Sequence, residues 1–128
     1  MPGGGDQFRA GVEARDFDAA LGALAEDVVL HSPVTFKPFE GRAAVSHVLR
    51  TVAEVFEDFR YTDHLRDGNT SALIFQARVG DRSVDGMDLV RENADGLIDD
   101  FTVMIRPLSG LTALAEEMGR RLGERPPA

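Results

Sequence analysis

The chain has 128 residues, a hydrophobic fraction of 43% and a formal net charge of −8 at pH 7. This length suits one domain, and the hydrophobic fraction excludes a disordered acidic segment. The acidic charge argues against binding to nucleic acid or to an anionic membrane, because both need a basic face. Cysteine is absent, which excludes disulfides and thiolate chemistry. With no signal peptide and no run of ~20 apolar residues, we expect a cytoplasmic protein that neither spans nor binds a membrane.

The sequence predicts one domain between two flexible tails. Residues 1–5 are expected to form the first tail, residues 6–124 the domain, and residues 125–128 the second tail. Gly3–Gly5 is not a phosphate loop, because it lacks a preceding strand and the Lys-Ser/Thr partner.

The N-terminal half is predicted to be mainly helical. A first helix begins at Asp6 and a second at Asp16, both of which are suitable N-caps. The second helix is expected to continue through apolar residues at helical spacing: Phe17, Leu21, Leu24 and Val28. A short strand then runs from Val28 to Pro33, and residues 34–41 form a loop.

The third helix has the clearest pattern, and strands follow it. Its apolar residues recur every three or four positions: Val45, Val48, Leu49, Val52, Val55, Phe56 and Phe59. The period then changes to that of strands, with turns at Asp67–Gly68, Gly80–Asp81 and Asp95–Gly96. The predicted strands cover residues 60–66, 72–79, 82–93 and 97–106. Pro107 ends the last strand, and a helix from Leu111 to Leu122 follows, which Gly123 could close.

Helices segregated from an antiparallel sheet indicate an α+β fold. Several strands are apolar on both faces, so both faces of the sheet need a cover. Helices can cover one face. We expect a second copy of the chain to cover the other, which predicts a homodimer.

One acidic residue lies in an apolar strand. Asp88 shares strand parity with Val84 and Val90, while Met87 and Leu89 occupy the opposite side. A buried carboxylate must be paired, neutral or in a pocket. Asp88 is therefore the first candidate for a functional group, and the alternative is an aspartate satisfied by a structural arginine or by backbone amides.

The order of elements and several short motifs resemble the SnoaL-like branch of the nuclear transport factor 2-like (NTF2-like) superfamily. The supporting segments are Arg15–Asp18, Ala25–Leu30, Ser32–Pro33, Gly41–Ala44 and Asp95–Ile98. That superfamily also contains ketosteroid isomerases, limonene-epoxide-type hydrolases and polyketide cyclases. The resemblance implies a cone in which a curved, mostly antiparallel sheet wraps around helices, with a pocket for a small apolar molecule at the wide end.

The resemblance to the isomerases implies three site positions. The tyrosine of their first helix corresponds to Phe8, the carboxylate base to Ser32, and the protonated aspartate to Asp88. Phe8 cannot donate a hydrogen bond and Ser32 is no base without an activating partner, so steroid isomerisation by that mechanism is not expected. Hydrolase chemistry would use Arg82, Asp85 and Asp88, but the two aspartates have opposite strand parity. The resemblance to the polyketide cyclases implies a site that needs only one acidic residue.

His31 is the one nearby group that could assist. It directly precedes Ser32 and could relay protons or activate the hydroxyl. Neighbours in a regular strand point to opposite faces, so the two cooperate only where Pro33 makes the strand irregular. The alternative is a histidine at the rim or at an interface.

The remaining predictions concern the pocket and its contents. Apolar residues expected to line it are Phe8, Phe56, Val90, Phe101, Val103 and Ile105. Three histidines at irregular spacing carry no metal signature, and we expect neither a metal nor a cofactor. Two functions stay open: acid/base chemistry of the isomerase, cyclase or hydrolase type that uses Asp88, or a non-catalytic ligand-binding or dimerisation module.

Overall fold

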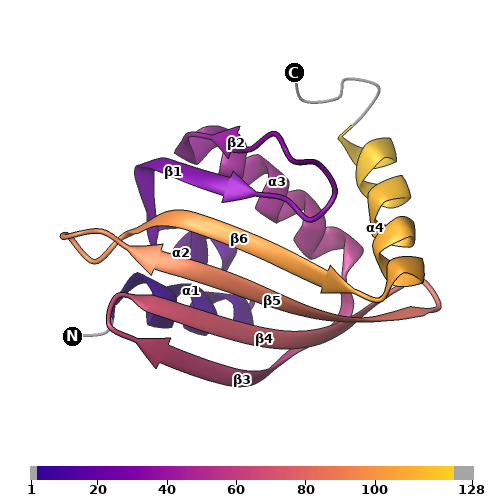
Figure 1. Ribbon diagram of the computed structural model, residues 1–128, viewed down its shortest axis with the longest axis horizontal. Helices are drawn as coiled ribbons and strands as arrows, with labels where there is room; N and C mark the ends of the chain where they lie inside the picture. The colour runs from indigo at the N-terminus through magenta and orange to yellow at the C-terminus, as the bar shows by residue number, and fades with distance from the viewer. Residues whose placement is uncertain (1–2, 123–128) are drawn as a thin grey trace.

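The computed structural model describes residues 3–122, which form helices packed on one curved sheet (Figure 1). Within this range the helices are α1 (Gly4–Glu13), α2 (Phe17–Leu21), α3 (Arg42–Val55) and α4 (Leu108–Arg121). The strands are β1 (Leu24–His31), β2 (Phe39–Glu40), β3 (Glu57–Asp67), β4 (Thr70–Val79), β5 (Arg82–Glu92) and β6 (Ile98–Arg106). None of these helices is long and apolar enough to cross a membrane.

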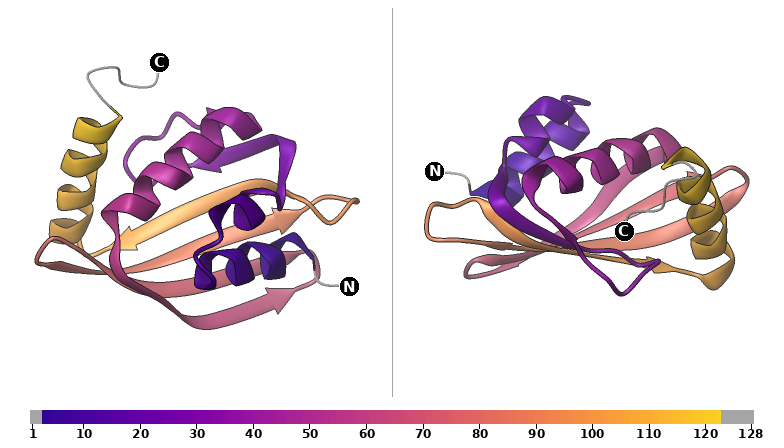
Figure 2. Two further views of the ribbon diagram at one scale, coloured as in Figure 1. Left: turned by 180° about the vertical axis from the view of Figure 1, so that it is seen from behind. Right: turned by 90° about the horizontal axis from the view of Figure 1, so that it is seen from above.

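The six strands form one sheet in the order β2-β1-β6-β5-β4-β3. All neighbours are antiparallel except β1 and β6, which are parallel. Helices α1, α2 and α3 lie on one side of the sheet and α4 stands at one end, as the view from above shows (Figure 2). The predicted α+β class, with a curved and mostly antiparallel sheet, is confirmed.

The second predicted helix is too long. α2 ends at Leu21, Gly22 is its C-cap, and β1 begins at Leu24. Residues four apart share a face in a strand as well as in a helix, so the spacing of Leu24 and Val28 could not distinguish the two. Leu24 and Val28 are both buried in β1, and they would also be buried on the inner face of a helix.

The third predicted helix is also too long, because α3 ends at Val55. Phe56 already has extended backbone, and Asp58 lies in the left-handed region at φ 53°. Phe59 therefore belongs to β3. Phe56 and Phe59 still pack inward on the same apolar cluster, which is why one stripe appears to cross the junction. The predicted loop 34–41 also holds the short strand β2.

The predicted N-terminal tail is wrong for Gly4 and Gly5, which form the buried first turn of α1. The Gly4 amide donates to the Gly96 carbonyl at 2.8 Å, and the Gly5 amide donates to Glu92 Oε2 at 2.9 Å. These contacts hold the start of α1 on the sheet. Residues 1–2 and 123–128, with the predicted closing Gly123 and the second tail, lie outside the described residues.

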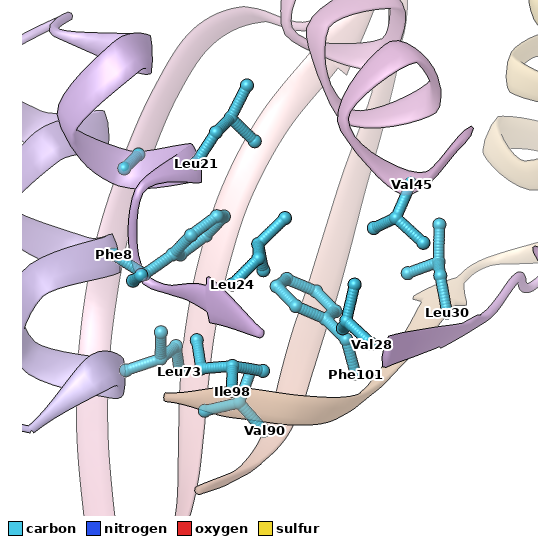
Figure 3. Close-up of a cluster of buried hydrophobic side chains, with 12 residues drawn as sticks. Phe8, Leu21, Leu24, Val28, Leu30, Val45, Leu73, Val90, Ile98 and Phe101 are labelled. Carbon is cyan, nitrogen blue, oxygen red and sulfur yellow. The ribbon is translucent and has the colours of Figure 1, made fainter. Parts of the chain in front are cut away.

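Two apolar clusters join the helices to the sheet. In the first, shown in Figure 3, Phe8 of α1 meets Phe101 of β6 edge to face, with ring centroids 5.1 Å apart. The second gathers around Phe75 of β4, Val84 of β5 and Leu114 of α4. Tyr61 of β3 packs against both clusters.

Candidate functional site

A cavity of about 840 Å³ lies between the helices and the sheet. All four helices and strands from both halves of the sheet contribute to its wall. The apolar side chains of this wall include Phe8, Val12, Phe17, Leu21, Leu30, Val48, Leu49, Val52, Phe56, Phe59, Phe75, Val103, Leu114, Met118 and Leu122. A mostly apolar cavity of this volume is typical of sites for small organic molecules.

Asp88 lies in this wall, on the face of β5 that points toward the helices. Asp88 is only 7% exposed, and its carboxyl group forms no hydrogen bond or ion pair with any residue of the range 3–122. Burial raises the pKa of the Asp88 carboxyl from 3.8 to about 8. Asp88 is therefore mostly protonated at pH 7 and can donate a hydrogen bond into the cavity.

Tyr61 of β3 is the site residue that the sequence analysis missed. Its side chain lines the same cavity, and its buried hydroxyl has no hydrogen-bond partner within residues 3–122. Burial raises the pKa of this hydroxyl far above its usual value, and the nearby charge of Asp88 raises it further. The tyrosine is thus a neutral donor close to Asp88. It is the only tyrosine of the chain and lies on a strand with alternating pattern, which was the one signal available.

Neighbouring side chains hold the Tyr61 ring in place. The ring meets that of Phe59 edge to face at 5.0 Å, and the Arg9 guanidinium lies 5.6 Å from its centroid. Across the strands, Tyr61 is in register with Phe75, and Phe75 with Gly86. A locked ring fixes the direction in which the hydroxyl can donate.

His31 and Ser32 are not brought together at the cavity. Ser32 lines it, but its Oγ accepts a hydrogen bond from the Val34 amide at 3.0 Å. His31 is not part of the cavity wall, and its Nε2 lies 3.0 Å from Oδ1 of Asp100. Pro33 therefore produces no irregularity that joins the two side chains.

The predicted pocket residues divide into two groups. Phe8, Phe56 and Val103 line the cavity. Val90 and Phe101 are fully buried in the first apolar cluster, and Ile105 packs against the second. Within residues 3–122, no three His, Asp or Glu side chains converge as metal ligands would.

The arrangement offers two neutral donors in an apolar wall. A carbonyl oxygen could accept from both the Asp88 carboxyl and the Tyr61 hydroxyl, and charge that develops on that oxygen would be stabilised. Removal of a proton from carbon needs a base, and Ser32 supplies none. Asp88 could act as one in its ionised form, at pH near or above 8.

Comparisons with protein families, curated proteins and solved structures bear on the fold. A family model described as a SnoaL-like domain matches residues 6–101. The chain belongs to the SnoaL-like domain family. The predicted resemblance is thereby confirmed. A search of curated proteins finds no match.

Several solved structures are similar to this chain. A steroid delta-isomerase from Pseudomonas aeruginosa is 48% identical, with a TM-score of 0.84 over 88% of this chain and 84% of that one. An uncharacterised protein with a cystatin-like fold from Silicibacter pomeroyi is 37% identical, with a TM-score of 0.86 over 91% and 82%. An NTF2-like protein of unknown function from Mesorhizobium loti is 21% identical, with a TM-score of 0.68 over 78% and 85%, and shares the fold alone.

Proposed function

We propose that this SnoaL-like protein binds a small, mostly apolar carbonyl compound in the cavity, with Asp88 and Tyr61 donating hydrogen bonds to the carbonyl oxygen. One observation carries the proposal: a protonated carboxyl, Asp88, and a tyrosine whose hydroxyl has no partner within residues 3–122, Tyr61, both belong to the wall of the same mostly apolar cavity. The Tyr61 hydroxyl is buried without a partner among residues 3–122, so a ligand oxygen that accepts from it and from Asp88 would be favoured over a purely apolar ligand.

The chemistry that fits such a site is proton transfer next to the carbonyl, as isomerases and cyclases perform it. The steroid delta-isomerase with 48% identity supports this class. The alternative is ligand binding without turnover. It is supported by Phe8 and Ser32, which stand where the resemblance to the isomerases implied a donor and a base. Turnover with Asp88 as the base would require its ionised form.

Binding can be tested with two ligands of the same shape. 2-Acetylnaphthalene has a carbonyl oxygen and 2-ethylnaphthalene has none, and each can be measured by displacement of fluorescent N-phenyl-1-naphthylamine. At pH 6 we expect the ketone to bind about tenfold more tightly, which corresponds to two net hydrogen bonds. The preference should fade as the pH rises through about 8, where Asp88 loses its proton. Equal affinities at pH 6 would contradict the proposal.

Turnover is tested separately with a Δ5-3-ketosteroid. Formation of the conjugated enone is followed by absorbance in wild type and in Asp88→Asn. If Asp88 is the base, the rate rises with pH through about 8 and is lost in the variant. Ketone binding without any turnover would support the non-catalytic alternative.

We further propose that the protein is a homodimer through the sheet face opposite the helices. That face carries apolar side chains in register on three strands: Ala72 and Ile74 of β4, Met87 and Leu89 of β5, and Met104 of β6. Met104 is 52% exposed, and Leu65 of β3, at 64%, extends the patch. Apolar patches of this kind mark interfaces between subunits. The cytoplasmic location stays a prediction from the sequence.

A further inference from the structure

Charged side chains line the cavity where the α1–α2 turn, α3 and the beginning of β3 meet. Three of them have ionic partners: Glu13 with Arg9 at 3.2 Å, Arg50 with Asp18, and Asp58 with Arg78 at 2.8 Å. Arg60, also in this wall, donates to the side-chain oxygen of Gln76. These four groups are therefore engaged with the protein itself.

Arg15 is the exception among the charged residues of this wall. It lines the cavity and is exposed, and its guanidinium forms no hydrogen bond or ion pair within the part of the chain that the structure describes. The chain has 22 acidic residues for 14 basic ones, yet none of the described acidic side chains lies within ion-pair distance of Arg15. The free cation borders a cavity in which Asp88, mostly protonated at neutral pH, supplies little charge to balance it.

The backbone of Arg15 adds a second observation. It lies in the left-handed region at φ 59°. The Arg15 amide donates to the Val12 carbonyl at 3.0 Å, and the Asp16 amide to the Gly11 carbonyl at 2.8 Å. This pair of bonds is the Schellman ending of a helix, in which glycine usually occupies the position of Arg15. An arginine thus stands where the fold alone favours glycine, and strain of this kind is frequent at binding sites.

We propose that the ligand of this cavity is amphipathic, with an apolar body that carries an anionic group, such as a carboxylate, which pairs with Arg15 at the mouth. The inference rests on the proposed function, because it assigns the second polar group of the same ligand. The Arg9 guanidinium of α1 lies 5.6 Å from the centroid of the Tyr61 ring, so the helix that ends two residues before Arg15 runs beside the strand that carries Tyr61. A molecule with a carbonyl at one end and an anion at the other would meet all three groups.

Two related fluorescent probes separate the anionic contact from apolar binding. N-Phenyl-1-naphthylamine is apolar and neutral, and 1-anilinonaphthalene-8-sulfonate is the same skeleton with an added sulfonate. Both are titrated against wild type and the variants Arg15→Gln and Arg15→Lys. Arg82→Gln is the matched control, because it removes the same charge from an exposed position of β5 that does not line the cavity.

We expect Arg15→Gln to weaken the sulfonate about two- to fivefold, as for other exposed ion pairs, and to leave the neutral probe unchanged. Arg15→Lys should retain most of the sulfonate affinity, and Arg82→Gln all of it. The neutral probe should displace the sulfonate from wild type. An equal loss for both probes, no loss for the sulfonate, or a sulfonate that the neutral probe does not displace would overturn this inference. If the neutral probe fails to bind wild type, the proposed function itself is wrong.

Discussion

The Tyr61 hydroxyl lies close enough to Asp88 for the charge of that carboxyl to raise the tyrosine pKa, although the two residues are on strands separated by β4. Neither side chain has a hydrogen-bond partner within residues 3–122. The Tyr61 hydroxyl is therefore buried without a partner, which is unfavourable, and burial also disfavours the charged form of Asp88. A ligand oxygen that accepts from both would recover this free energy on binding.

The raised pKa of Asp88 predicts a pH-dependent stability. Its folded pKa of about 8 exceeds the ordinary value of 3.8, so between these values the folded state binds more protons than the unfolded state. The contribution of Asp88 is complete below pH 3.8 and is lost as the pH rises to about 8, by at most about 1.4 kcal/mol per pH unit. We expect Asp88→Asn, measured by urea unfolding, to gain stability relative to wild type as the pH rises from 5 to about 8.

The control for this prediction is Asp85→Asn on the opposite face of β5. Asp85 Oδ2 lies 2.6 Å from Nη1 of Arg106, and its side chain is 43% exposed. The difference in stability between this variant and wild type should stay constant from pH 6 to pH 9. A constant difference for Asp88→Asn as well would show that the Asp88 carboxyl is ionised throughout.

Tyr61→Phe should stabilise the protein and weaken ketone binding. The substitution removes a buried hydroxyl that has no partner within residues 3–122, so the free energy of unfolding should rise by about 1 kcal/mol. The ring contacts with Phe59 and Phe75 are retained. The affinity for 2-acetylnaphthalene should fall about threefold to tenfold, while that for 2-ethylnaphthalene stays the same. A hydroxyl bonded to ordered water or to another protein group would instead make the variant less stable.

The architecture followed from the sequence because hydrophobic periodicity determines which side chains are buried. The strands from β4 onward and the C-terminal helix were predicted from alternation and spacing, as was the shared face of Val84, Asp88 and Val90. The predicted ends of elements were less accurate where a helix and a strand both satisfy the same apolar spacing, as for Leu24 and Val28 in β1. The end of the third helix was predicted too late because the apolar stripe continues through Phe56 and Phe59, although the helical backbone ends at Val55.

The site was predictable only in part, for a physical reason. Asp88 could be identified from local context, because an acid in an apolar strand is unusual by itself. Tyr61 could not, since an isolated tyrosine in an alternating strand is ordinary. Its role arises from register across β4 and from a shifted register between Tyr61 and Asp63. Such a shift depends on long-range pairing that a pattern within one segment does not record.

Gly86→Ala should be destabilising, because the Phe75 ring lies directly over Gly86. A Cβ at residue 86 would lie 2.1 Å from Cζ of Phe75. The ring would have to move from its place beside Phe59, and overpacking of this kind costs about 1–3 kcal/mol. Gly119→Ala in α4 is the control, because its added Cβ meets nothing within 4 Å. That change should stabilise the helix by about 0.5–1 kcal/mol. Thermal unfolding of both variants tests whether their effects have opposite sign.

Met104→Glu should separate the proposed dimer. The substitution places a charge among Met87 and Ile74 on the outer sheet face, and a buried unpaired charge is strongly unfavourable. Sedimentation velocity should show a dimer for wild type and a monomer for the variant. Leu108→Glu is the matched control, since Leu108 is 77% exposed at the start of α4 and lies off that face. A wild-type protein that stays monomeric at all concentrations would contradict the homodimer.

Arg15→Gly should raise stability and lower anion affinity at the same time. Glycine adopts the left-handed conformation without the strain that Arg15 carries at φ 59°, so the free energy of unfolding should increase by about 1 kcal/mol. The guanidinium is lost, so affinity for 1-anilinonaphthalene-8-sulfonate should fall as in Arg15→Gln. Urea unfolding and probe titration on the same samples measure both effects. If stability rises while sulfonate binding is unchanged, Arg15 is a strained surface residue with no part in binding. If stability falls, the Arg15 side chain itself supports the fold, and the ending of α1 does not favour glycine.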